Sequence, residues 1–432
     1  MSIRADIIVK NAAQLVTSFW GQTGTGQEAD SGLLLIEDAA LAARGEKIVA
    51  VGKTSAVMDA VDASNAKVID AAGQLVTPGF VDPHTHPVFA ATRQDEFEMR
   101  IRGKTYRKIA MAGGGIKSSV RKVREAGEDY LRRQATLHLD RFLACGTTTI
   151  EAKSGYGLSV ADELKLLRVI KELAEGHVVE VLPTFLGAHE IPEEYRGRRE
   201  YYIDLIIEEM LPRVAEEKLA VFCDVFCEEH VFTFDESKRI LQAAQKVGLI
   251  PKIHADQLSD GRGAELAAKV GAISADHLDH ISDEGISALA GSDVIPVLLP
   301  GAVFFLGLKK YAPARKMIRA GLPVALATDF NPGSSPSQSM PMMMALACTQ
   351  MHMTPAEALV ASTVHAAAAI GRVDEVGRLE VGMQADFVIF NLEDYKLLPY
   401  HFGMNFVDKV VKKGNIVFKS GNEIHDNANI KI

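Results

Sequence analysis

The sequence contains few cysteines, and this shortage limits what the protein can be. Its 432 residues include 4 cysteines. So few cysteines in so long a chain do not form the disulfide framework of a small secreted domain. Cys223 and Cys227 lie in the run AVFCDVFCEE. Because no second cysteine pair follows them, we expect buried thiols there rather than a zinc knuckle.

The sequence also lacks a long apolar run and a long basic run. Its most apolar stretch, residues 294–308, is interrupted by Pro296, Pro300 and Gly301, and it is shorter than the ~20 residues that span a membrane. The opening residues MSIRADIIVKN lack the apolar segment of a signal peptide. The net charge is −9 at pH 7, and the densest basic cluster is RGRR at residues 196–199. We therefore expect a cytoplasmic protein with no membrane and no nucleic-acid partner.

What the sequence does contain is an alternation of short β-branched runs with longer segments of helical period. The runs are residues 79–86, 146–155, 178–187, 219–229, 249–257, 272–280, 293–301 and 323–331. Eight strand–helix units over roughly 300 residues predict an α/β fold, a (β/α)₈ barrel of the TIM type. The alternative is an open doubly wound sheet, but no glycine fingerprint of a nucleotide-binding sheet follows the first run.

A glycine-rich segment, AGGGIKSS at residues 112–119, lacks the spacing of a phosphate-binding loop. We expect a mobile loop there, and a lid formed by Gly113–Gly115 is one interpretation of it.

The two ends of the chain contain short strand-like segments joined by turns. Neither end alone has enough strands for a stable pair of sheets. We therefore predict one β-sandwich domain built from residues 1–75 together with residues 376–432. The barrel, residues 76–375, would be inserted between its two halves.

Metal-type side chains stand at the C-terminal ends of four predicted strands. His84 and His86 are one residue apart, so their side chains point to the same face of a strand. His254, His277 and Asp329 end the fifth, sixth and eighth runs. Barrel active sites are built at this face from the ends of different strands. The pattern therefore predicts a metal site.

The nature of these ligands indicates which ion they hold. The set His84, His86, His254 and Asp329 suits Zn²⁺ or Fe²⁺ better than Mg²⁺ or Ca²⁺. The fourth run, residues 219–229, has no lysine that could be carbamylated to bridge two ions. We therefore expect one divalent transition metal ion per chain, zinc or iron.

Several segments resemble the amidohydrolase superfamily and, within it, the imidazolonepropionase family. They are LVTPGFVDPHTHPVFAATR, MAGGGIKSSV, GTTTIEAKSGYGL, FLGAHEIPEEY, KIHADQL, SADHLDH, LLPGAVFFLG and LATDFNPGSSPS. The resemblance implies hydrolysis of the cyclic amide C–N bond of 4-imidazolone-5-propanoate to N-formimidoyl-L-glutamate, a step of histidine degradation. It also implies a small anionic heterocyclic substrate and suggests a homodimer.

Two other functions stay open at this point. One is another enzyme of the same superfamily, a deaminase or cyclic-amide hydrolase that acts on a different heterocycle. The other is a barrel that has lost catalysis and serves as a scaffold, although none of the metal-type side chains is missing here.

The resemblance implies a catalytic role for two residues. Asp329 would bind the metal, accept a proton from the attacking water and pass it to the departing nitrogen. His277 would stabilise charge on the carbonyl oxygen, with a fourth metal ligand as the alternative. Arg93, in the loop after the first strand, would pair with the propanoate because its planar guanidinium matches a carboxylate.

The resemblance places further residues at the substrate, and one of them departs from the family pattern. The further residues are Tyr156, His189, Asn331, Gly333 and Ser334. Many family members have a glutamate three residues after the fifth-strand histidine, where it resembles a proton shuttle. This chain has Gln257 there, and an amide does not titrate at neutral pH. Asp329, His277 or His189 would then have to move the proton.

Overall fold

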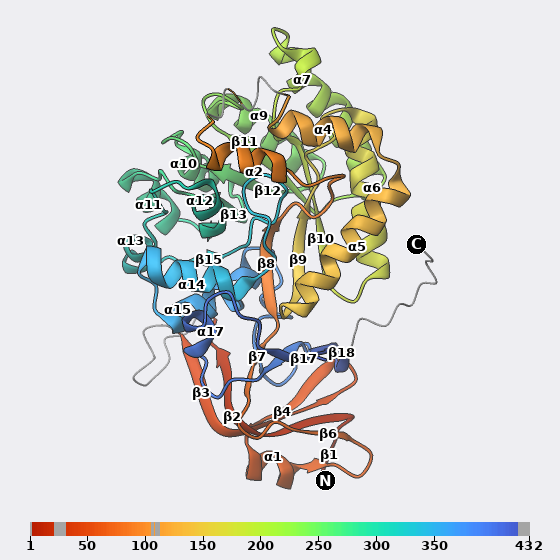
Figure 1. Cartoon of the computed structure of the whole chain (residues 1–432), viewed down its shortest axis with the longest axis vertical. Helices are drawn as coiled ribbons and strands as arrows, with labels where there is room; N and C mark the ends of the chain where they lie inside the picture. The colour runs from red at the N-terminus through yellow and green to blue at the C-terminus, as the bar shows by residue number, and fades with distance from the viewer. Residues whose placement is uncertain (1, 21–31, 105–107, 109–112, 422–432) are drawn as a thin grey trace.

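The computed structural model describes residues 2–20, 32–104, 108 and 113–421. In Figure 1 a barrel surrounded by helices lies above a sheet that contains strands from both ends of the chain. No helix in the described part is long and apolar enough to cross a lipid bilayer.

Eight parallel strands form the barrel, and neighbours in space are neighbours in the chain. They are β8 (Phe80–Thr85), β9 (Thr147–Lys153), β10 (Glu180–Ala188), β11 (Phe222–Cys227), β12 (Ile250–Ala255), β13 (Ser274–His277), β14 (Ile295–Leu298) and β15 (Ala325–Leu326). The last strand closes on the first, since the backbone amide of Asp329 donates to the His84 carbonyl at 3.2 Å and that of His86 to the Phe330 carbonyl at 2.8 Å. The predicted (β/α)₈ barrel is confirmed.

The helices follow the strands and cover the outside of the barrel (Figure 1). They include α5 (Glu128–Ala144), α6 (Val160–Gly176), α9 (Phe234–Lys246), α10 (Gly263–Val270), α11 (Asp283–Ala290), α14 (Met340–Met351), α15 (Pro355–Ala361) and α16 (Val364–Ala368). Helix α9 shows why they form here. Thr233 and Glu236 make a reciprocal capping box at its start, and Ile240, Leu241 and Ala244 are buried on one face.

Two further helices, α2 (Gln94–Ile101) and α4 (Ile116–Glu125), lie between β8 and α5 in the chain. They are at the end of the barrel opposite the terminal sheet (Figure 1). The prediction of a loop at residues 112–119 is only partly right. Ala112 lies outside the described residues, and residues 116–119 form the first turn of α4, which begins after Gly115 at a φ of 83°. The amphipathic pattern of IKSSVRKV outweighs the glycines that precede it.

The two ends of the chain meet in one eight-stranded sheet, ordered β18-β17-β16-β7-β2-β3-β4 with β6 on β2. The strands are β2 (Ile7–Ser18), β3 (Leu33–Arg44), β4 (Lys47–Lys53), β6 (Lys67–Asp70), β7 (Leu75–Pro78), β16 (Phe387–Phe390), β17 (Val407–Lys412) and β18 (Asn415–Lys419). A parallel ribbon of β1 (Ile3–Arg4) and β5 (Val61–Asp62) accompanies it. Strand β7 has the central place, since it pairs with β2 on one side and with β16 on the other.

Strand β7 continues into the barrel through a single residue, Gly79. The backbone amide of Gly79 donates to the Asp386 carbonyl at 3.0 Å. A Cβ at Gly79 would lie 2.3 Å from the Thr148 hydroxyl, so a side chain does not fit. The strand that carries His84 is therefore anchored in the terminal sheet.

Candidate active site

A cavity of about 660 Å³ opens at the C-terminal end of the barrel. It contains all but one of the site residues that the sequence suggested. Those in its lining are His86, Arg93, Tyr156, His189, His254, Gln257, His277, Asp329, Asn331, Gly333 and Ser334. His84 is not in the lining, because its side chain is completely buried. The barrel thus brings together residues that are up to 250 positions apart in the sequence, as seen for Ser334 and His84.

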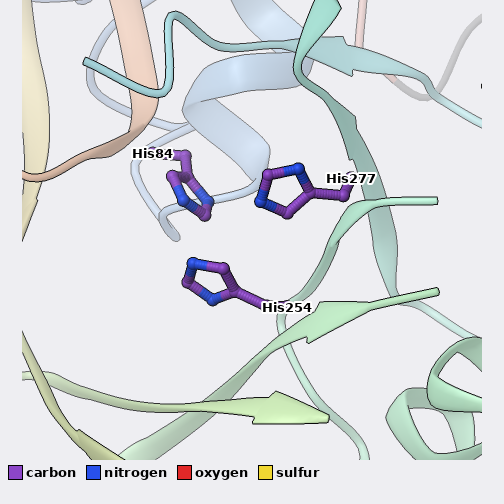
Figure 2. A group of neighbouring side chains, drawn as sticks. All are labelled: His84, His254 and His277. Carbon is purple, nitrogen blue, oxygen red and sulfur yellow. The ribbon is translucent and has the colours of Figure 1, made fainter. Parts of the chain in front are cut away.

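The metal-type side chains form two overlapping groups that share His84. One nitrogen each of His84, His254 and His277 lies within 4.8 Å of the others, and His84, His86 and Asp329 form the second group. Figure 2 shows the rings of the first group pointing toward one another from separate segments. The Asp329 Oδ1 atom lies 3.6 Å from His84 Nε2 and 3.7 Å from His86 Nε2. Five ligand-type side chains therefore meet at one place.

The protonation states of these groups fit a divalent metal ion. Buried polar atoms normally have a hydrogen-bond partner, yet His84 Nε2, His86 Nδ1 and His277 Nδ1 have none among the described residues. Burial lowers the pKa of all three rings well below its usual value, so they are neutral and can offer a lone pair. Burial also raises the pKa of Asp329 to about 7, and a cation among these groups would offset that desolvation cost.

Local backbone geometry directs two of these side chains into the site. His277 and Asp329 have φ angles of 79° and 52°, in the left-handed region that non-glycine residues rarely adopt. Consecutive residues of a regular strand point to opposite faces. Because Asp276 already points toward His84, the left-handed turn at His277 lets its ring reach the same site. Such strained positions cluster at functional sites.

Two aspartates that the sequence reasoning missed lie against the histidines. His84 Nδ1 is 2.6 Å from Asp276 Oδ2. His254 Nδ1 is 2.9 Å from Asp224 Oδ2, although the alignment falls short of a regular hydrogen bond. A carboxylate on the second nitrogen fixes the tautomer of a metal-binding histidine. A signal for Asp276 was present, since Ser274 and Asp276 alternate with an alanine in the buried run SAD, whereas Asp224 is the single charged residue of the run FCDVFC.

The other charged residues of the cavity give it a positive region. Arg93 Nε and Nη2 both donate to Glu96 Oε2, at 3.0 and 2.6 Å. Arg100 Nη1 donates to the Gly333 carbonyl at 3.3 Å, and Lys104 also lines the cavity. Outside the metal-type cluster, the cavity lining therefore contains three cationic side chains and one carboxylate, that of Glu96. The sequence pointed to Arg93 alone, whereas Arg100 lies two helical turns further along the same face.

The loop after β15 is shaped so that Arg93 can approach it. The Asn331 side chain accepts from the backbone amides of Gly333 and Ser334, both at 2.8 Å. A Cβ at Gly333 would lie 2.2 Å from Arg93 Nη1, so only glycine leaves room for the guanidinium. Ser334 Oγ is 3.3 Å from Asp329 Oδ2. This loop thus links the positive region to the metal-type cluster.

Two aromatic side chains complete the lining near His86. The His189 ring stacks on His86, with centroids 5.3 Å apart and planes at 16°, and its Nδ1 is 2.9 Å from the Gly155 carbonyl. Burial lowers the pKa of His189 to about 3 and raises the pKa of Tyr156. Both groups are neutral at pH 7, so they offer hydrogen bonds without charge.

Known proteins resemble this chain over nearly its whole length. The sequence model of the amidohydrolase family matches residues 306–417. The imidazolonepropionase of Geobacillus sp. (strain WCH70) is 50% identical over 418 residues, 96% of this chain and 98% of that protein. The one from Solibacter usitatus is 50% identical over 415 residues, 96% and 99% of the two chains.

Solved structures share the fold at much lower identity. An adenosine deaminase from Xanthomonas campestris with bound zinc has a TM-score of 0.69 and 18% identity, covering 96% of this chain and 93% of its own. The guanine deaminase of E. coli has a TM-score of 0.70 and 15% identity, covering 96% and 100%. Given the identity of half its residues to the curated relatives, the chain belongs to the imidazolonepropionase family of amidohydrolases.

Proposed function

We propose that the protein hydrolyses the ring amide C–N bond of 4-imidazolone-5-propanoate and releases N-formimidoyl-L-glutamate, a step in histidine degradation. The observation that carries this proposal is a single cavity lined both by metal-type ligands and by cations. The part of the cavity that is lined by metal-type ligands suits a reaction at a carbonyl group. The part that is lined by cations suits the propanoate carboxylate. A deaminase that acts on a neutral nucleobase would not need these cations.

We propose that His84, His86, His254 and Asp329 hold one Zn²⁺ or Fe²⁺ ion. The unpaired ring nitrogens of His84 and His86 and the buried carboxyl of Asp329 support that assignment, and one ring nitrogen of His254 lies within 4.8 Å of one of His84. When bound, such an ion lowers the pKa of a water from 15.7 to about 7 and polarises a carbonyl oxygen.

In this proposal Asp329 moves the proton. Its carboxylate accepts a proton from the attacking water and then gives it to the departing ring nitrogen. Ser334 Oγ, 3.3 Å from Oδ2, and the amide of Asn331, 2.7 Å from the Asp329 carbonyl, keep the aspartate in place. Gln257 takes no part in proton transfer because an amide does not titrate.

The remaining residues bind and orient the substrate. His277, neutral and without a partner on Nδ1, donates a hydrogen bond to the carbonyl oxygen as charge develops there. Arg93 and Arg100 bind the propanoate. The ring would contact the other residues of the lining, which are Tyr156, His189, Gln257, Asn331, Gly333 and Ser334.

Three further proposals concern the whole protein. The four free cysteines support a reducing cytoplasmic location. The resemblance supports a homodimer, which sedimentation velocity would test. The domain bounds, residues 1–75 with 376–432 and residues 76–375, stay a prediction that limited proteolysis can check.

A turnover assay tests the proposed reaction. Metal-loaded enzyme should consume 4-imidazolone-5-propanoate, measured by loss of its ultraviolet absorbance, and product should appear in equal amount by mass spectrometry. A panel of other cyclic amides and of amino-substituted heterocycles is the control. Faster turnover of a panel member than of the imidazolone would reject the substrate assignment while keeping the hydrolase.

A further inference from the structure

A cluster of buried charges lies next to the candidate metal site, and the proposed mechanism does not use it. It consists of Glu151, Lys153, Asp224, Lys252 and Asp276, and the side chain of each is completely buried. Burying so many charges is unfavourable unless they are paired and hydrogen-bonded. The pairs they make therefore indicate what the cluster does.

Lys153 connects the two aspartates that contact histidines. Its Nζ atom is 2.7 Å from Asp224 Oδ2 and 3.7 Å from Asp276 Oδ2, and it also donates to Glu151 Oε1 at 2.8 Å. Among the described residues it is the only lysine or arginine that contacts both aspartates. Burial alone would lower the pKa of Lys153, but Asp224 and Glu151 outweigh that effect and raise it. The lysine is therefore charged.

The positions of these residues follow from the barrel. Lys153 is on β9, Asp224 on β11 and Asp276 on β13, which are alternate strands. Residues from alternate strands form the packed layers inside a TIM barrel. Such layers are usually apolar, whereas here one cation and two anions occupy the layer beside His84 and His254.

We propose that Lys153 is a positioning residue, which holds Asp224 and Asp276 in place so that these carboxylates fix the ring orientation and the Nδ1 proton of His254 and His84. Each histidine then presents Nε2 to the metal. This inference rests on the metal ligands proposed above. Without Lys153 the two carboxylates lose their common cation. The Nδ1 atoms of His84 and His254 then lose an acceptor that is fixed in position.

Lys252 provides a matched control, because it is a second lysine buried in the same interior. Its Nζ donates to Ser274 Oγ at 2.7 Å and to the Ala369 carbonyl at 3.3 Å, and it lies 3.9 Å from Asp276 Oδ2. It makes no ion pair with Asp224 among the described contacts. Replacing Lys252 therefore removes a buried lysine but keeps the contacts of Lys153 with both aspartates.

The experiment measures the affinity for Zn²⁺ by competition with a chelating dye in wild type, Lys153→Met and Lys252→Met. Because Lys153→Met leaves Glu151 unpaired, the double variant Glu151→Gln/Lys153→Met is included, which removes one charge of each sign. Circular dichroism and thermal unfolding report the fold. We expect the Zn²⁺ dissociation constant to rise roughly 10–100-fold in both Lys153 variants, and to change far less in Lys252→Met.

A second measurement needs no variant. In the metal-free wild type, nitrogen-15 NMR should show His84 and His254 protonated on Nδ1, and Nε2 protonation would overturn the inference. Equal Zn²⁺ affinity in wild type and in the folded double variant would also overturn it, and would leave the proposed ligands intact. A wild-type chain that binds no Zn²⁺ would instead reject those ligands, and this inference with them.

Discussion

Asp329 faces two opposing demands at the scale of a single residue. Burial disfavours its charge and raises its pKa to about 7, while ligation and proton acceptance both need the carboxylate. Replacing it by asparagine keeps the shape and an oxygen ligand but removes the basic group.

We expect Asp329→Asn to lower kcat by roughly 10²–10⁴-fold with an unchanged circular dichroism spectrum. The comparison is Asp283→Asn, at an exposed aspartate paired with Lys316, which should keep full activity. An Asp329→Asn enzyme with wild-type turnover would remove this residue from the mechanism.

His277 is the residue whose two possible roles an experiment can separate. His277→Asn adds little backbone strain, because asparagine tolerates the positive φ of this position. If the ring stabilises charge on the carbonyl oxygen, kcat should fall by roughly 10²–10³-fold while the metal content stays at the wild-type level. Loss of the metal, measured by atomic emission, would identify His277 as a ligand instead.

The convergence of the metal-type residues was predictable, because parallel strands of a barrel place their C-terminal ends at one face. Which groups contact which was not predictable. The pairs of His84 with Asp276 and of His254 with Asp224 depend on the stagger between strands. The reach of His277 depends on a left-handed backbone turn that no residue type there requires.

At the scale of the element, the cations of the cavity lie on helix α2 and on the residues that flank it. Arg93 precedes the helix, Glu96 lies in its first turn and Arg100 in its last. Glu96 also accepts from the Gly115 amide at 3.1 Å, which ties α2 to the start of α4. Sequence reasoning stopped at Arg93, because nothing in the residues after it indicated how this helix lies over the barrel.

We expect Arg100→Met to raise KM roughly 10-fold with little change in kcat, which corresponds to one charge-assisted hydrogen bond. Arg102→Met is the matched control, since Arg102 directly follows the same helix but has an exposed side chain paired with Glu98. Its kinetics should stay at wild-type values. Equal KM values for the two variants would exclude Arg100 from carboxylate binding.

At the scale of the whole molecule, a partly buried histidine couples stability to pH. The His365 ring packs edge-on against Trp20, and its Nδ1 is 2.9 Å from the Val324 carbonyl. Burial lowers the pKa of His365 to about 4, against about 6.5 in an unfolded chain. Below pH 6.5 the unfolded state binds the extra proton, so this contribution to stability is complete above pH 6.5 and is lost progressively down to pH 4.

The loss from His365 amounts to about 3 kcal/mol in the free energy of unfolding. Urea unfolding at several pH values should therefore show a shallower acid-side decline in His365→Gln than in wild type. The exposed His401 serves as the control, and His401→Gln should keep the wild-type slope. Parallel curves for wild type and His365→Gln would show that His365 does not govern acid stability.

The central place of β7 has a consequence for synthesis on the ribosome. One of its partners, β2, precedes it, but the other, β16, begins only at Phe387, after the whole barrel. At about 5–20 residues per second, translation of that interval takes on the order of 15–60 s. Throughout that time the nascent chain carries an open strand edge at Leu75 and Val76, which makes it a natural client for chaperones.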